Sequence, residues 1–171
     1  MSRPRPSVSV IGAGAATAEE KALAEEVGRL VAERGAVLVC GGLGGVMEAA
    51  CRGARSADGL TVAVLPGYDR SAANPWAEVA IATGLAEARN VVVAASGDGC
   101  IAVGGSLGTL SEIAIALKLG RPVVALGSWR LEPNRLREDS RLLTAETPAE
   151  AVELLFQELG APDPKRRNAH G

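Results

Sequence analysis

The chain of 171 residues is long enough for one globular domain with a full core, and its 47% apolar and 22% charged residues exclude a disordered chain. Its formal net charge of −2 excludes a global basic field for nucleic acid or an anionic membrane, and no stretch approaches the roughly 20 apolar residues of a membrane span. We therefore expect neither nucleic acid nor membrane as a partner.

The first third of the chain alternates between strand and helix patterns. Short β-branched or wholly apolar runs predict strands, and apolar residues at helical spacing predict helices. In chain order these are a strand at 7–11, a helix at 18–34 that opens with a Thr17–Glu20 capping box, a strand at 36–40, a helix at 46–57 and a strand at 60–66. This β-α-β-α-β order predicts a doubly wound parallel sheet.

The rest of the chain continues the alternation, with one ambiguous stretch. Propensity alone favours a strand and a tight turn in VVVAASGDG (91–99), but a helix over 86–96 preserves the α/β order, and we favour the helix. The remaining expected elements are strands at 78–84, 100–104, 121–127 and 142–145, a helix that ends near 120, a charged loop at 128–140 and a last helix from a Thr147–Glu150 capping box to about 159. We expect a single domain over 1–160 and a disordered tail over 161–171.

Glycine-rich turns follow three of the predicted strands and lead into helices. In a parallel sheet these turns meet at the carboxyl edge, where exposed N–H groups and helix dipoles favour phosphate. The residues that we expect to bind a phosphorylated ligand there are Gly12, Gly41, Gly42, Gly45, Gly104, Gly105, Ser106, Gly108 and Thr109.

Two familiar nucleotide motifs do not fit. GAGAAT (12–17) has Thr17 where a dinucleotide fingerprint has its third glycine, and the strand at 36–40 does not end in the expected acid, so NAD binding is disfavoured. No Gly-Lys pair occurs, which excludes a P-loop.

Three charged side chains are candidates for the site. Glu112 is either a capping partner of Thr109 or a site carboxylate, and the preceding glycine run favours the site. Arg89 either binds an anionic ligand or is an ordinary surface arginine. Glu48 is either a second site carboxylate or an acid in the first turn of a helix.

Rare residue types narrow the chemistry further. The only histidine is His170, near the end of the chain, which argues against His-based catalysis and against a His-ligated metal, so we expect no metal. Two tryptophans either stack on a ligand or are partly covered in a core or interface, namely Trp76 and Trp129. Three cysteines without C-x-x-C spacing predict reduced, buried thiols in a cytoplasmic protein, and these are Cys40, Cys51 and Cys100.

These motifs resemble a known superfamily. GGSLGTLSE (104–112) is similar to the P-G-G-x-G-T-x-x-E motif of the Lonely Guy (LOG) phosphoribohydrolases, once called lysine decarboxylases. Arg89 and Asn90 fall where those proteins carry an Arg-Lys pair, and GGLGGVMEAA (41–50) resembles their other glycine turn. The resemblance covers about 7–127 and is closer to the branch that contains the molybdenum cofactor carrier protein, which shares the Arg-Asn pair and the GTLSE form.

The resemblance implies a Rossmann-like α/β fold, with a mostly parallel sheet of about seven strands, helices on both faces, and homodimers or homotetramers. Hydrolases of the superfamily cleave nucleoside 5′-monophosphates to base and ribose 5-phosphate without a cofactor. By resemblance, Glu112 and Arg89 would be catalytic, and the glycine turns and Asn90 would hold an AMP-like nucleotide.

Two departures from the hydrolase motif support an alternative. Asn90 replaces the lysine and Val103 replaces the proline. In the carrier branch the same pocket is expected to hold a molybdopterin-type ligand without cleaving it. The sequence therefore predicts a phosphoribohydrolase-like nucleotide-binding protein, or alternatively a non-catalytic carrier of molybdenum cofactor or another phosphorylated ligand.

Overall fold

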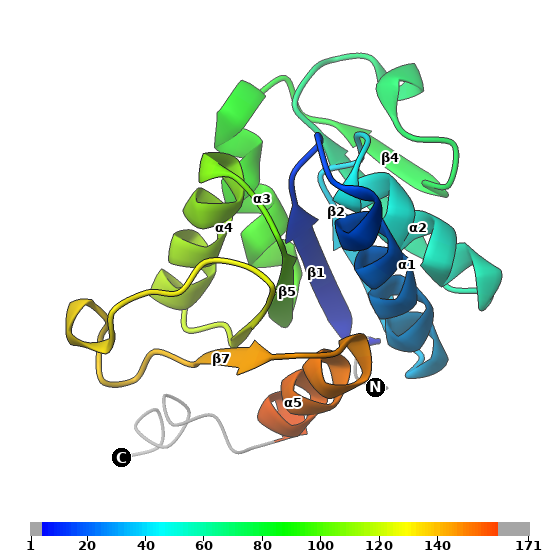
Figure 1. Ribbon diagram of the computed structural model, residues 1–171. Coiled ribbons are helices and arrows are strands. Elements are labelled where there is room, and N and C mark those ends of the chain that lie inside the picture. Colours follow the sequence, from blue (N-terminus) through cyan, green and yellow to red (C-terminus); the bar gives the residue numbers. More distant parts are fainter. Residues whose placement is uncertain (1–4, 161–171) are drawn as a thin grey trace.

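The computed structural model describes residues 5–160 and contains a seven-stranded parallel sheet in the order β4-β3-β2-β1-β5-β6-β7 (Figure 1). The strands are β1 (Ser7–Gly12), β2 (Val37–Cys40), β3 (Thr61–Leu65), β4 (Val79–Ala82), β5 (Gly99–Val103), β6 (Val123–Leu126) and β7 (Leu142–Ala145). Every strand pairs parallel to its neighbours, which confirms the predicted doubly wound sheet. The predicted tail over 161–171 lies outside the described residues.

Helices cover both faces of the sheet. The helices are α1 (Ala18–Glu33), α2 (Val46–Ser56), α3 (Arg89–Ser96), α4 (Leu107–Lys118) and α5 (Pro148–Gly160). One apolar layer joins α1, α2 and α5 to the sheet, and a second layer on the other face joins α3 and α4 to it (Figure 1). Because both faces are covered, every residue of β5 is buried, which explains its wholly apolar sequence. Over residues 5–160, no helix is long and apolar enough to cross a membrane.

The ambiguous stretch is helical, as the strand-helix alternation predicted. A short 3-10 turn over Ala86–Ala88 leads into α3, and Ala86 adopts a positive φ of 49°. Inside α3, Val93 is buried and its carbonyl accepts a hydrogen bond from the Ser9 hydroxyl of β1 at 2.7 Å. Packing against the sheet therefore outweighs the strand propensity of the valines.

The helices α1 and α2 pack at backbone contact through two glycines. A Cβ atom added at Gly28 would lie 2.0 Å from the Ala50 carbonyl oxygen, and one added at Gly53 would lie 1.8 Å from that of Glu25. Helix α1 starts at the predicted capping box, in which the Thr17 and Glu20 side chains each bond the other's backbone N–H. This side of the sheet is thus fixed by close contacts that only glycine permits.

Candidate functional site

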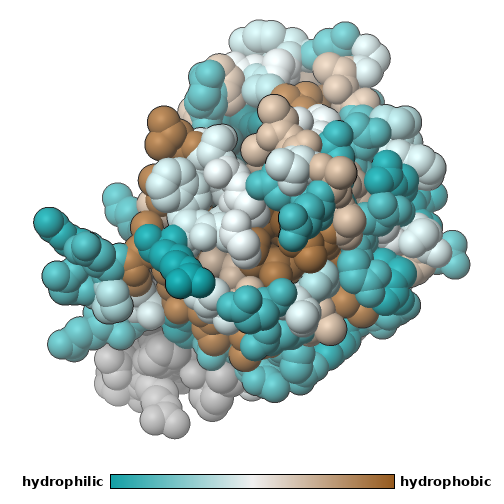
Figure 2. Space-filling model, in the orientation of Figure 1, coloured by the Kyte–Doolittle hydropathy of each residue, from teal (hydrophilic) through white to brown (hydrophobic). Residues whose placement is uncertain are grey.

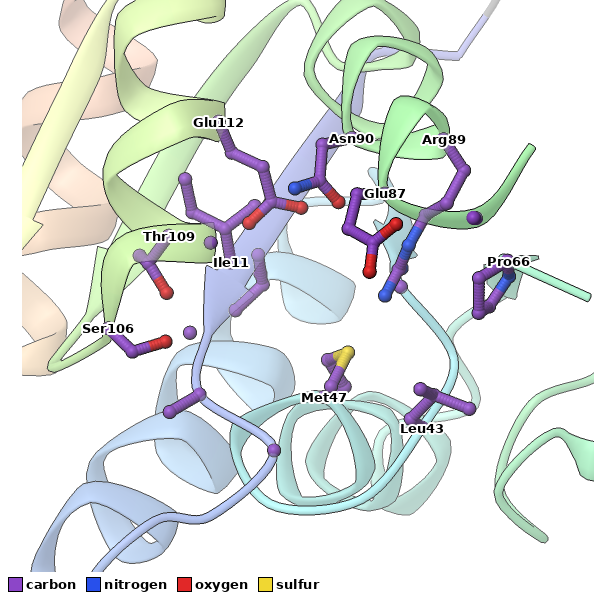
Figure 3. A pocket seen from close by; sticks show the side chains of 17 residues that line it. Ile11, Leu43, Met47, Pro66, Glu87, Arg89, Asn90, Ser106, Thr109 and Glu112 are labelled. Carbon is purple, nitrogen blue, oxygen red and sulfur yellow. The ribbon is translucent and has the colours of Figure 1, made fainter.

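A cavity of about 410 Å³ lies at the carboxyl ends of β1, β2 and β5, at the switch point of the sheet. Its volume falls within the range of small-molecule sites. In Figure 3, Glu112 and Thr109 lie on one wall, Arg89 lies on the opposite wall, and Met47 of α2 lies between them. Eight of the residues predicted for the site line this cavity, namely Gly12, Gly41, Arg89, Asn90, Ser106, Gly108, Thr109 and Glu112.

The other four predicted glycines shape the turns and do not line the cavity. Gly45 has a φ of +64°, and a Cβ atom there would lie 2.3 Å from the Ala13 carbonyl oxygen, so it allows the first two turns to touch. Gly105 has a φ of +113°, and its Cβ would meet the Thr109 side chain at 2.6 Å. Gly42 and Gly104 also have positive φ, and their role in ligand binding stays a prediction.

The N-terminus of α4 opens toward the cavity without a side-chain cap. The helix starts at Leu107, and its N-cap residue Ser106 makes no capping hydrogen bond. Thr109 therefore lies within the first turn and is not the cap, which excludes Glu112 as its capping partner. Since Ser106, Gly108 and Thr109 line the cavity, the uncapped N–H end of α4 offers a place for an anionic group.

Glu112 is a buried carboxyl that faces the cavity (Figure 3). Only 7% of its surface is exposed, and no hydrogen bond reaches its carboxyl from any residue in the described part of the chain. Burial raises the pKa of Glu112 to about 7, while the positive charge of Arg89 acts in the opposite direction. Near neutral pH this side chain can therefore accept a hydrogen bond when ionised and donate one when protonated.

Arg89 is positioned by the backbone around it. It is the first residue of α3, and its Nη1 donates a hydrogen bond to the Val64 carbonyl at 3.1 Å. The guanidinium lies directly against Gly41, where an added Cβ would be 1.8 Å from Nη1. Its remaining N–H groups have no hydrogen-bond partner among residues 5–160, so they are available to an anionic ligand.

Asn90, which stands where the hydrolases carry lysine, links α3 to α4. Its Nδ2 donates to the Ser111 hydroxyl at 3.0 Å, and that hydroxyl donates to the Gly108 carbonyl at 2.7 Å. The uncharged Asn90 side chain thus joins α3, which carries Arg89, to α4.

Sequence reasoning missed part of the cavity lining. Most of the missed residues are small or apolar side chains, which carry no chemical signal of their own. Position was the available signal, because four of them lie within the motifs GAGAAT and GGLGGVMEAA and Glu87 lies two residues before Arg89. The missed residues are Val10, Ile11, Ala13, Gly14, Leu43, Met47, Pro66, Ala86 and Glu87.

The other candidates lie outside the cavity lining. Glu48 is in the first turn of α2, the position of a favourable helix acid. Neither Trp76 nor Trp129 lines the cavity. Trp129 instead supports the turn between β5 and α4, because its Nε1 donates to the Ser106 carbonyl at 3.1 Å, and the adjacent Ser128 hydroxyl donates to the Gly104 carbonyl.

Sequence comparison places the chain among known proteins. The model of the SLOG cluster4 family matches residues 5–152. The chain belongs to the SLOG cluster4 family. Within curated proteins, this SLOG chain is 48% identical over 145 residues to an uncharacterized protein of Archaeoglobus fulgidus, covering 85% of this chain and 91% of that one.

Solved structures confirm the predicted resemblance to the carrier branch. The molybdenum cofactor binding protein of Rippkaea orientalis matches this SLOG protein with a TM-score of 0.84 and 37% identity, over 92% of this chain and 99% of that chain. The molybdenum cofactor carrier protein of Chlamydomonas reinhardtii matches with a TM-score of 0.81 and 32% identity, over 92% and 100%. DNA processing protein A from Helicobacter pylori matches with a TM-score of 0.65 and 24% identity, over 90% and 81%, which shows the fold alone.

Proposed function

We propose that this SLOG protein is a non-catalytic carrier that holds molybdenum cofactor, or a similar phosphorylated molybdopterin-type ligand, in the cavity between Glu112 and Arg89. The observation that carries the proposal is the likeness to molybdenum cofactor binding and carrier proteins over nine-tenths or more of both chains. It favours the carrier over the phosphoribohydrolase.

The donor set of the cavity fits such a cargo. The uncapped N-terminus of α4 and the unpartnered N–H groups of Arg89 suit a phosphate. The buried carboxyl of Glu112 suits ring N–H donors, such as those of a pterin. Lining groups such as Met47 and Leu43 are apolar and suit a flat ring.

Native mass spectrometry tests the carrier proposal. The protein is purified from a host that makes molybdenum cofactor, and the bound molecule is released by denaturation and identified. We expect a phosphorylated pterin in the wild type and in Arg130→Ala, an exposed arginine outside the cavity lining, and its loss in Arg89→Ala. A clean AMP signal with no pterin would contradict the proposal.

Hydrolysis is the second candidate, and the buried Glu112 is the observation that favours it. A carboxylate in a dry cleft can stabilise the cationic transition state of N-glycosidic bond cleavage. Asn90, however, supplies no positive charge where the hydrolases have lysine. We expect AMP incubated with the protein to release no more adenine than with Glu112→Gln, as measured by chromatography, and excess release by the wild type would favour the enzyme.

We also propose that the carrier is a cytoplasmic homodimer or homotetramer. Helices α3 and α4 expose three large apolar side chains, and Figure 2 shows hydrophobic groups among hydrophilic ones on one face of the molecule. These side chains are Val91, Leu107 and Leu119, with 49%, 74% and 48% of their surface exposed. Sedimentation velocity should give a dimer or tetramer that Val91→Glu weakens and Val79→Glu, on the β4 edge, leaves intact, and a monomeric wild type would refute this.

A further inference from the structure

We propose that Cys40 and Cys51 are a redox-sensitive pair, which a peroxide converts to a disulfide beneath the turn over 41–45 and which thereby weakens ligand binding. Cys40 is the last residue of β2, and Cys51 lies in the second turn of α2. Their sulfur atoms are 3.4 Å apart, and both residues are completely buried. The turn over 41–45, which supplies Gly41 to the cavity, therefore joins two residues whose sulfur atoms are in contact.

The backbone of the turn is bonded to the pair. The Gly42 N–H donates to the Cys40 sulfur at 3.3 Å. Asn74, which is only 8% exposed, is bonded to the same turn twice. Its backbone N–H donates to the Gly42 carbonyl at 2.8 Å, and its Nδ2 donates to the Leu43 carbonyl at 3.2 Å. The pair is thus bonded to the backbone that shapes the site, whereas a purely apolar pair of core cysteines would not be.

The two thiols are chemically different. The hydrogen bond between the two sulfur atoms, assisted by one from the Asn74 side chain, lowers the pKa of Cys51. The bond to Cys51, together with burial, raises the pKa of Cys40 well above its usual range. Cys51 is therefore the more readily ionised of the two thiols, and the proposal assigns it the attack and Cys40 the resolving step.

The oxidation balances with hydrogen peroxide as the oxidant. The Cys51 thiolate attacks one peroxide oxygen, so an S–O bond forms, the O–O bond breaks, and the departing hydroxide takes a proton to become water. The Cys40 sulfur then attacks the Cys51 sulfur, so the S–S bond forms, the S–O bond breaks, and the leaving hydroxide takes the Cys40 proton as a second water. Two thiols and one peroxide yield one disulfide and two waters.

Closing the bond shifts the turn. A disulfide holds its sulfur atoms about 2.05 Å apart, so they must approach by about 1.3 Å from their present separation. Gly41 follows Cys40 directly and has no room to move toward Arg89, because even an added Cβ would lie 1.8 Å from Nη1. Because Gly41 contacts the guanidinium, a shift of this turn changes the position of Arg89, and this step of the inference rests on the proposed function of the cavity.

Mass mapping after peroxide treatment tests the pair itself. In the full-length protein we expect the loss of two hydrogens, a cross-link between the peptides of Cys40 and Cys51, and reversal by dithiothreitol. Cys51→Ser and Cys51→Ala should abolish the cross-link, while Cys100→Ser should retain it, because Cys100 is equally buried but lies in the apolar layer on the other face. If peroxide oxidised the cysteines of the wild type to sulfinic or sulfonic acids without a cross-link, the proposed Cys40–Cys51 disulfide would be wrong.

Calorimetric titration with AMP, as a phosphorylated probe, tests the coupling. We expect the oxidised protein to bind AMP at least fivefold more weakly than the reduced protein, with recovery after dithiothreitol. A disulfide with unchanged affinity would overturn the coupling. If the reduced protein binds no AMP, the proposed use of the cavity for phosphorylated ligands is weakened, while the mass map still decides whether the pair forms.

Discussion

Glu112 differs in its surroundings from the acidic residues that form ion pairs in this structure. Ion pairs such as Arg52–Glu25 and Arg55–Glu78 lie on the surface, where such pairs contribute little to stability. Glu112 is buried with no hydrogen bond, which destabilises the fold whenever the carboxyl is ionised. A ligand that supplies the missing partner would remove this cost.

The pKa of Glu112 predicts a pH dependence of stability. The folded protein keeps this proton up to about pH 7, whereas the unfolded chain loses it near 4.5, so stability falls as pH rises through that window. Glu112→Gln lacks this effect. In chemical denaturation, the free energy of unfolding of the variant relative to wild type should rise by roughly 2–3 kcal/mol from pH 5 to pH 8. The same difference at both pH values would show that the carboxyl is not strained by burial.

Gly41 and Gly44 form a matched pair of substitutions in one turn. Gly41→Ala places a methyl group 1.8 Å from Arg89 Nη1 and should expel the guanidinium from its bond to Val64. Gly44→Ala meets nothing closer than 3.8 Å. We expect Gly41→Ala to weaken binding of a phosphorylated ligand at least tenfold in calorimetry and Gly44→Ala to change it less than twofold. Equal effects would mean that Arg89 does not contact the ligand.

At the scale of elements, the turn between β5 and α4 depends on a segment distant in sequence. In this turn Ser106 lines the cavity. The carbonyl groups of the turn accept hydrogen bonds from Ser128 and Trp129, which follow β6. The ends of β1 and β5 are level, with Gly12 paired to Val103, so the turns after both strands meet at the same height. The N-terminal end of α4 is therefore set by three separate stretches of chain.

Trp129→Phe tests this support. The substitution keeps an aromatic ring but removes the Nε1 hydrogen bond to the Ser106 carbonyl, which costs about 1 kcal/mol in a typical case. We expect ligand affinity to fall about three- to tenfold, measured by calorimetry. Trp76→Phe is the control, since within residues 5–160 the hydrogen bonds of Trp76 involve its backbone atoms alone. If both variants bind alike, the turn is rigid without its support.

Local patterns predicted most of the helices and strands. Apolar runs and capping boxes are short-range signals, which can be read from a few neighbouring residues. The helix over 86–96 needed the order of the whole sheet to overrule valine propensity. The site was predictable where glycine turns mark strand ends. The support from Trp129 and the clamp from Asn74 were not, since each joins segments more than 20 residues apart and carries no motif.

At the scale of the whole molecule, the cavity lies at the carboxyl edge of the sheet, where the helical layers of its two faces meet. Met47 comes from α2 on one face, while Arg89 and Glu112 come from α3 and α4 on the other face. A ligand that bridges them binds only the folded chain and therefore stabilises all of it.

Saturation with the cargo should therefore raise the melting temperature. At a ligand concentration of 100 times Kd, linkage stabilises the fold by about 2.7 kcal/mol, which for a chain of this size corresponds to roughly 5–10 °C. Thermal melts of cargo-loaded and empty protein measure this shift, and Gly41→Ala should reduce it. An unchanged melting temperature would mean that the ligand does not bind the folded chain in preference to the unfolded one.

The glycine contact between α1 and α2 has a consequence for motion. Helices whose backbones touch at Gly28 and Gly53 cannot slide or tilt without a clash. The wall of the cavity that α2 forms is therefore rigid. The opposite wall is held by side-chain hydrogen bonds instead, since Arg89 donates to the Val64 carbonyl and Asn90 donates to the Ser111 hydroxyl. A bulky ring that enters or leaves the cavity should therefore displace these side chains and leave the first two helices in place.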